Sequence, residues 1–137
     1  MVQKLWKAGL AAIRAPASGA RAKHVFYPDV VAIYSGKVLV FEVKYRGEPG
    51  PIYIDREKLE KLREFARRAG GEVYIAVKYG RREWMFVKPE DCRETPSGIR
   101  VDPQTLEEKG VSLSALIGLV KGQQLITSYT READKIV

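Results

Sequence analysis

At 137 residues, 45% of them hydrophobic, the chain is long enough for one hydrophobic core and too short for two comfortable domains. Its 24 Lys and Arg residues outnumber its 17 Asp and Glu residues, and the formal charge of +7 favours a polyanionic partner, with nucleic acid as the first candidate. A single cysteine excludes an intramolecular disulfide. With no long apolar run and no signal-peptide pattern, we expect a cytoplasmic protein that does not enter a membrane.

Hydrophobic periodicity and turn-forming residues divide the chain into short helices and strands. In chain order, they predict a helix over residues 1–9, a strand over 10–14, a hairpin over 29–42, a helix over 55–69, a second hairpin over 72–88 and a closing helix capped by Ser112. The helix over 55–69 has the length of a crossover between parallel strands, so we expect a mixed sheet. The predicted fold is one α/β domain over residues 1–120, a central mixed sheet flanked by helices, followed by a partly disordered tail over 121–137.

The first hairpin brings two acidic residues to its open end. Pro28-Asp29 is followed thirteen residues later by Glu42-Val43-Lys44, and the turn-forming dipeptide Ser35-Gly36 lies midway between the acids. With that dipeptide as a two-residue loop, paired positions sum to 71, so Asp29 lies opposite Glu42 and Lys44 shares the face of Glu42. Directly opposed residues have Cβ atoms roughly 4.5–5.5 Å apart, so both carboxylates can reach one cation.

Electrostatics favours a divalent ion between these acids. Two carboxylates about 5 Å apart repel by roughly 3 kcal/mol at an effective dielectric constant near 20, and a bound cation removes that cost. Oxygen ligands without a His or Cys cluster favour Mg²⁺, with Mn²⁺ as a substitute, and the carbonyl of Val43 is a plausible third ligand. Lys44 could stabilise charge on a phosphate or orient the attacking water. The pattern therefore predicts a metal-dependent nuclease.

The alternative is that these acids simply pair with lysines across strands. Apolar residues on both faces of the hairpin, such as Val31 and Ile33 on one and Ala32 and Phe41 on the other, instead indicate buried central strands. Acids at the end of such strands are costly to bury without a purpose. Basic residues expected near this end are candidates for DNA binding, although each is equally consistent with a solvated charge, and they are Arg14, Arg21, Lys23 and Lys78.

An ordered set of motifs extends this pattern over residues 1–120. The set consists of Gly9-Leu10, Ser18-Gly19, Pro28-Asp29, Glu42-Val43-Lys44, Phe65 to Gly71, Ala76-Val77-Lys78 and Gly110 to Leu113. In this order the motifs resemble the archaeal Holliday-junction resolvases, a family of restriction-endonuclease-like fold. The resemblance implies a homodimeric, magnesium-dependent endonuclease that cuts four-way DNA junctions by paired nicks in homologous recombination and repair.

Carried over position by position, the resemblance gives roles to individual residues. Asp29 and Glu42 would ligate the metal, and Lys44 would act beside the scissile phosphate. The remaining roles lie outside the hairpin, with Ser18 in the mobile active-site loop, Arg14 and Lys78 in DNA binding or catalysis, and Phe65 in the dimer contact. Phe65 is also consistent with a core position, in which case residues 111–119 and the hairpin of Trp84 and Phe86 would form the dimer.

One feature of the family is missing from this chain. Resolvases of this kind carry a further catalytic Glu in their first helix, and alignment on Gly9 places that position just before Met1. Three explanations are open, which are a start codon assigned too late, a truncated sequence, and a protein that works with a reduced set of residues; we favour the late start, because residues 1–6 resemble a helix entered midway without a capping residue. Two other functions remain open, which are a restriction-like nuclease acting on flaps, single strands or duplex, and a non-catalytic DNA-binding homologue.

Overall fold

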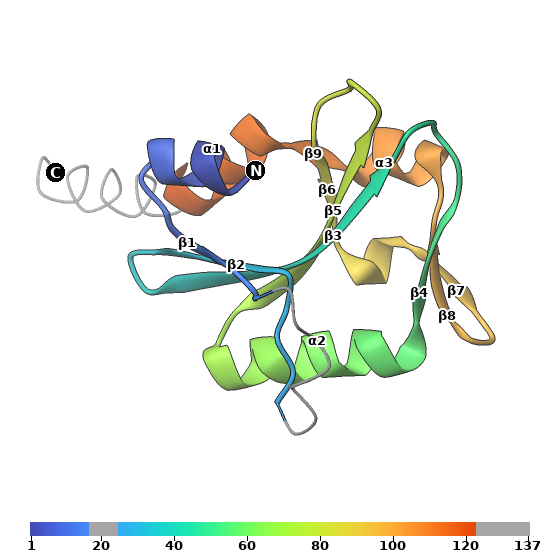
Figure 1. The fold of residues 1–137 in the computed structure, drawn as a ribbon, viewed down its shortest axis with the longest axis horizontal. Coiled ribbons are helices and arrows are strands. Elements are labelled where there is room, and N and C mark those ends of the chain that lie inside the picture. Colours follow the sequence, from blue (N-terminus) through green and yellow to red (C-terminus); the bar gives the residue numbers. More distant parts are fainter. Residues whose placement is uncertain (17–24, 123–137) are drawn as a thin grey trace, which may run out of the picture.

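The computed structural model describes residues 1–16 and 25–122, and a six-stranded mixed sheet forms its centre (Figure 1). The strand order is β1-β2-β3-β5-β6-β9, and a smaller sheet has the order β4-β8-β7. The elements are α1 (Val2–Lys7), β1 (Ala11–Arg14), β2 (Val30–Tyr34), β3 (Lys37–Arg46), β4 (Ile52–Asp55), α2 (Arg56–Ala69), β5 (Glu72–Tyr79), β6 (Met85–Val87), η2 (Pro89–Asp91), β7 (Arg93–Thr95), β8 (Gly98–Val101), α3 (Pro103–Lys109) and β9 (Val111–Ser112), with a further helix over residues 113–122.

The first hairpin has the predicted turn and register. Ser35 and Gly36 have φ angles of 49° and 84°, as a two-residue hairpin turn requires. Tyr34 pairs with Lys37, and the ladder continues in register to Val30 opposite Phe41. The next pair outward along these strands is Asp29 and Glu42, so the predicted register is confirmed.

The predicted parallel crossover is also confirmed. Strands β3 and β5 run parallel, and α2 connects them through β4. Asp55 caps α2 by accepting a hydrogen bond of 2.8 Å from the backbone N–H of Lys58, and Gly70 ends the helix in the left-handed conformation. The helix returns the chain beside β3, so the large sheet is mixed.

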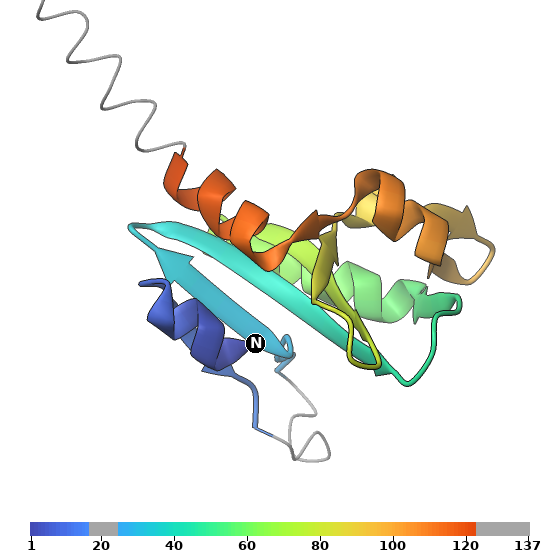
Figure 2. The ribbon, with the colours of Figure 1, turned by 90° about the horizontal axis from the view of Figure 1, so that it is seen from above.

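Two layers cover opposite faces of the large sheet (Figures 1 and 2). On one face, Leu5 of α1 and Leu116 of the last helix pack with Phe41 and Phe86. On the other face, α2 packs on β3 and β5, where Leu62 contacts Val40 in a buried cluster. Strand β3 is therefore apolar on both faces because both are covered.

The expectation that both strands of the first hairpin are buried on both faces is wrong for β2, near the edge of the sheet. Ile13 of β1 and Ile33 of β2 are 65% and 38% exposed, on the face that α2 covers elsewhere. The reason is that α2 packs on β3 and β5 and leaves the β1–β2 half of this face open. The apolar run on both sides of β2 thus includes a surface that the described residues leave partly exposed.

Two regions differ from the predicted outline. The small sheet and α3 were not predicted, because strands of three or four residues carry too little periodicity. The closing helix begins as expected, with Ser112 Oγ accepting a hydrogen bond of 3.1 Å from Ala115 N–H, and continues through residue 122. Of the expected tail, residues 123–137 lie outside the described part. Within residues 1–16 and 25–122, every helix is too short or too polar to span a bilayer.

The close approach of β5 to β3 depends on a glycine without a side chain. A Cβ at Gly71 would lie 2.5 Å from the carbonyl oxygen of Val38 and 2.9 Å from its Cβ. We expect Gly71→Ala to lower the free energy of unfolding by about 1–3 kcal/mol, because β5 must move away from β3. Chemical denaturation measures this change. Gly47→Ala, where a Cβ meets nothing within 4 Å, is the control, and equal effects of the two substitutions would contradict this account.

Candidate active site

Asp29 is fixed at the open end of the hairpin by two backbone groups. Its Oδ2 accepts a hydrogen bond of 2.8 Å from Val43 N–H, and its carbonyl accepts one of 2.9 Å from Ala15 N–H. The first bond ties the carboxylate to β3, and the second ties the backbone to the end of β1. Asp29 is therefore held beside Glu42 by the strands on either side of it.

Glu42 is the unusual residue of the site. It is only 2% exposed, and it is the single buried charged side chain in the described part of the chain. Its Oε1 lies 3.2 Å from Lys58 Nζ and 3.9 Å from Lys44 Nζ, whereas Oε2 has no hydrogen-bond partner among residues 1–16 and 25–122. A buried carboxylate is costly unless its charge and lone pairs are satisfied. Within the described part of the chain, Oε2 is therefore the oxygen that still needs a partner.

The environment of Glu42 disfavours its charged form. Three effects raise the pKa of Glu42 to about 7. In order of importance they are burial, a hydrogen bond that the protonated acid can share with Asp29, and the charge of Asp29. Lys58 and Lys44 act in the opposite direction. A divalent cation between the carboxylates would favour the ionised form, so the residues present fit such an ion.

The donor set also indicates which ion fits. In the described residues, no group of three His, Cys, Asp or Glu side chains could hold a metal. Two carboxylates with nearby backbone oxygen suit Mg²⁺, which keeps several waters and uses few protein ligands. The structure brings together Asp29, Glu42, the Val43 backbone and Lys44 as the sequence predicted.

The other predicted site residues are more scattered. Arg14 pairs with Val30 and Lys78 pairs with Tyr45, so strand alternation places both side chains on the sheet face opposite Glu42. Lys78 Nζ lies 6.0 Å from the Trp84 ring centroid. Arg14, Lys4 and Lys78 all lower the pKa of the Met1 amine after burial, so they form one basic cluster there. Ser18, Arg21 and Lys23 lie outside the described residues.

Sequence reasoning missed Lys58. It lies in the first turn of α2, four residues before the buried Leu62, and therefore on the stripe that faces the sheet. A lysine on an otherwise apolar stripe was the available signal, but its partner Glu42 is distant in sequence.

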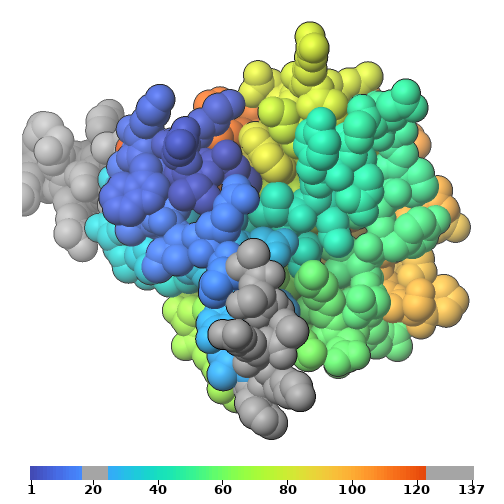
Figure 3. All heavy atoms as spheres, in the orientation of Figure 1, coloured from blue at the N-terminus to red at the C-terminus, as the bar shows by residue number. Residues whose placement is uncertain are grey.

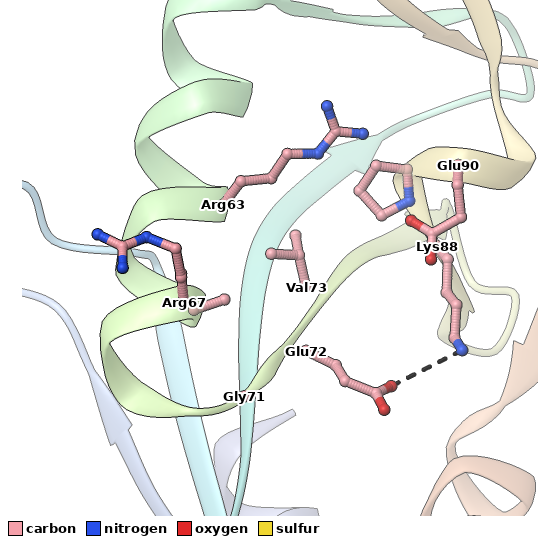
Figure 4. A pocket seen from close by; sticks show the side chains of 9 residues that line it. Arg63, Arg67, Gly71, Glu72, Val73, Lys88 and Glu90 are labelled. Atoms are coloured by element: carbon pink, nitrogen blue, oxygen red, sulfur yellow. Dashed lines mark ion pairs between the residues drawn. The ribbon is translucent and has the colours of Figure 1, made fainter.

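Two further features lie apart from this site. Cys92 is buried, and burial above all raises its pKa to about 12, so the thiol acts as a packed side chain. A pocket of about 420 Å³ lies at the other end of α2, between Arg63, Arg67, Glu72 and the η2 segment (Figure 4). Its charges are partly balanced, since Lys88 Nζ lies 3.7 Å from Glu72. The pocket contains neither acid of the hairpin.

Comparison with known proteins decides the family. The family model that describes the archaeal Holliday junction resolvase (Hjc) matches residues 1–125. This chain belongs to the archaeal Holliday junction resolvase family. The resemblance and the restriction-endonuclease-like fold expected from the motif order are thereby confirmed.

Individual relatives of the resolvase cover most of its length. This chain is 41% identical over 125 residues to the crossover junction endodeoxyribonuclease Hjc of Sulfurisphaera tokodaii, and the match covers 90% of this chain and 84% of that protein. The Archaeoglobus fulgidus Hjc is 34% identical over 118 residues, or 86% of this chain and 84% of that protein. A solved structure of A. fulgidus Hjc superposes with a TM-score of 0.77 at 33% identity and covers 85% of this chain and 93% of that chain.

The raised pKa of Glu42 predicts how stability depends on pH without divalent ions. Between about pH 4.5 and 7, Glu42 is ionised in the unfolded chain and protonated in the folded one. The free energy of unfolding of the native protein therefore falls as the pH rises from 4.5 through 7, and it falls no further above that pH. As the pH rises from 4 to 8, we expect the free energy of unfolding of Glu42→Gln to increase by roughly 3 kcal/mol relative to that of the native protein. Denaturation in a chelator measures that difference. A difference between Glu42→Gln and the native protein that does not change with pH would contradict the assigned pKa.

Proposed function

We propose that this chain resolves four-way DNA junctions as a homodimer, through a magnesium site formed by Asp29 and Glu42. The family assignment gives the enzyme class, an endonuclease that acts on branched DNA. The observation that carries the site is the buried Glu42 carboxylate, which has an unpartnered oxygen and a second carboxylate beside it. We infer from the DNA substrate that the protein works in the cytoplasm.

The residues of the hairpin divide the work at a phosphodiester. Asp29 and Glu42 would hold Mg²⁺, or Mn²⁺ in its place, with the carbonyl of Val43 as a third ligand. When bound, the ion would polarise the phosphate and stabilise the leaving oxygen. Lys44, with a side chain 23% exposed, can reach an incoming phosphate oxygen or orient the attacking water. Surrounding apolar side chains limit water around Glu42 and strengthen these interactions.

The metal site is tested by removing each carboxylate. We expect Asp29→Ala and Glu42→Ala to weaken Mg²⁺ binding by more than about 100-fold, because each removes a direct ligand. Isothermal titration calorimetry measures the affinity, and cleavage of a four-way junction in Mg²⁺ measures the activity that should be lost with it. Glu90→Ala, which removes an exposed carboxylate in η2, is the matched control.

Two results would change the proposal. Unchanged Mg²⁺ affinity in both hairpin variants would remove the site assignment. Equal cleavage rates for the junction and for linear duplex of the same sequence would instead indicate a restriction-like nuclease without junction selectivity. Neither result depends on the other, so the site and the substrate preference are tested separately.

The uncovered face of β1 and β2 supports the dimer. Ile13 and Ile33 lie on the face of the sheet that also carries Glu42, and α2 bounds this face with the partly buried Phe65. Exposed apolar side chains that adjoin one another favour burial by a second protein surface. A two-fold dimer would place two active sites against the two-fold related strands of a junction, which gives paired nicks.

The dimer surface is tested by charge substitution. We expect Ile33→Asp to shift the protein from dimer to monomer in sedimentation-velocity experiments, because the interface would bury an unpaired charge. Leu119→Asp is the control, since Leu119 is 52% exposed on the last helix, within the alternative surface at residues 111–119. A monomer produced by Leu119→Asp and not by Ile33→Asp would move the interface to that alternative surface.

A further inference from the structure

We propose that Lys58 is a positioning residue that serves as the internal counter-ion of Glu42 and competes with the divalent cation for it. This inference rests on the proposed function, because it takes Asp29 and Glu42 as the ligands of the ion. Lys58 Nζ lies 3.2 Å from Glu42 Oε1, closer than the 3.9 Å of Lys44. Lys58 therefore makes the shorter of the two ion pairs to the carboxylate.

The helix holds Lys58 where its charge is locally unfavourable. Its backbone N–H donates to the capping carboxylate of Asp55, which fixes it in the first turn of the fourteen-residue α2. A cation in the first turn of a helix opposes the helix dipole and is locally unfavourable. The pairing with buried Glu42 offsets this cost. The arrangement thus places a positive charge against the dipole in order to reach one carboxylate.

Charge counting at the site gives the consequence. When both carboxylates are ionised, as ion binding requires, Asp29 and Glu42 carry two negative charges, and Lys44 and Lys58 carry two positive charges within reach of Glu42. In that state the four groups balance, so a divalent cation adds two uncompensated positive charges. Lys58 repels that cation until a phosphate supplies negative charge. The ion is consequently held more weakly than two carboxylates alone would hold it.

Lys58 is also free to give way. Its side chain is 38% exposed, whereas the carboxylate that it contacts is 2% exposed. The ammonium can move into solvent along its flexible stem while Glu42 stays in place. The lysine therefore keeps the carboxylate aimed at the ion site without being a permanent part of the ion's ligand set.

The test measures Mg²⁺ affinity of the whole protein by calorimetry, without DNA. We expect Lys58→Met to bind Mg²⁺ about tenfold more tightly than the native protein, because it keeps the stem and removes the competing charge. Lys58→Arg should remain close to native because the charge is retained. Lys61→Met, one turn along α2 in an exposed pair with Glu57, is the matched control and should leave the affinity unchanged.

The outcomes separate this inference from the proposed function. Unchanged or weaker Mg²⁺ binding in Lys58→Met overturns the role of Lys58, even where Asp29→Ala abolishes binding as proposed. Equal tightening in Lys58→Arg and Lys58→Met also overturns it, because charge would then not be the cause. An absence of Mg²⁺ binding by the native protein overturns both proposals. A purely structural lysine would not produce tighter binding when it is lost.

Discussion

The burial of one carboxylate, Glu42, is the constraint on which the rest of the site depends. An ionised group that is 2% exposed must find its partners inside the fold. One oxygen meets two lysines, and the other faces the space shared with Asp29. The hairpin register produces this arrangement, because a slip of one residue would turn Glu42 to the opposite face of the sheet. The two-residue turn at Ser35-Gly36, midway between the acids, fixes this pairing.

A single helix then determines what surrounds that carboxylate. Because α2 is the crossover between parallel β3 and β5, it must lie over these two strands, and its first turn reaches Glu42. Within the described residues, the same placement leaves this one face of β1 and β2 without α2, and Ile13 and Ile33 are exposed there. Figure 3 shows the surface of the molecule in the orientation of Figure 1. The lysine beside the acid and the apolar surface proposed for the dimer are therefore two consequences of one connection.

Much of this arrangement could be predicted from local sequence, and the rest could not. The Ser35-Gly36 turn fixes the pairing of Asp29 with Glu42, because each residue pair follows from the one before it. Lys58 could not be assigned in this way, since its contact depends on how α2 is rotated against the sheet. The exposure of Ile33 was not predicted for the same reason, because an apolar residue does not show which element of the fold covers it.

The charge balance of the proposed site indicates where the attraction for DNA would arise. Asp29, Glu42, Lys44 and Lys58 cancel one another, so the formal charge of +7 comes from residues elsewhere. Part of it is the cluster of Arg14, Lys4 and Lys78, on the opposite face of the sheet or beside residue 1. In the proposed function, phosphate contacts by basic residues outside this balanced group would supply most of the attraction, and such contacts fix position without reading bases. If Asp29, Glu42, Lys44 and Lys58 form the catalytic centre as proposed, this distribution of charge favours selection by the shape of the DNA.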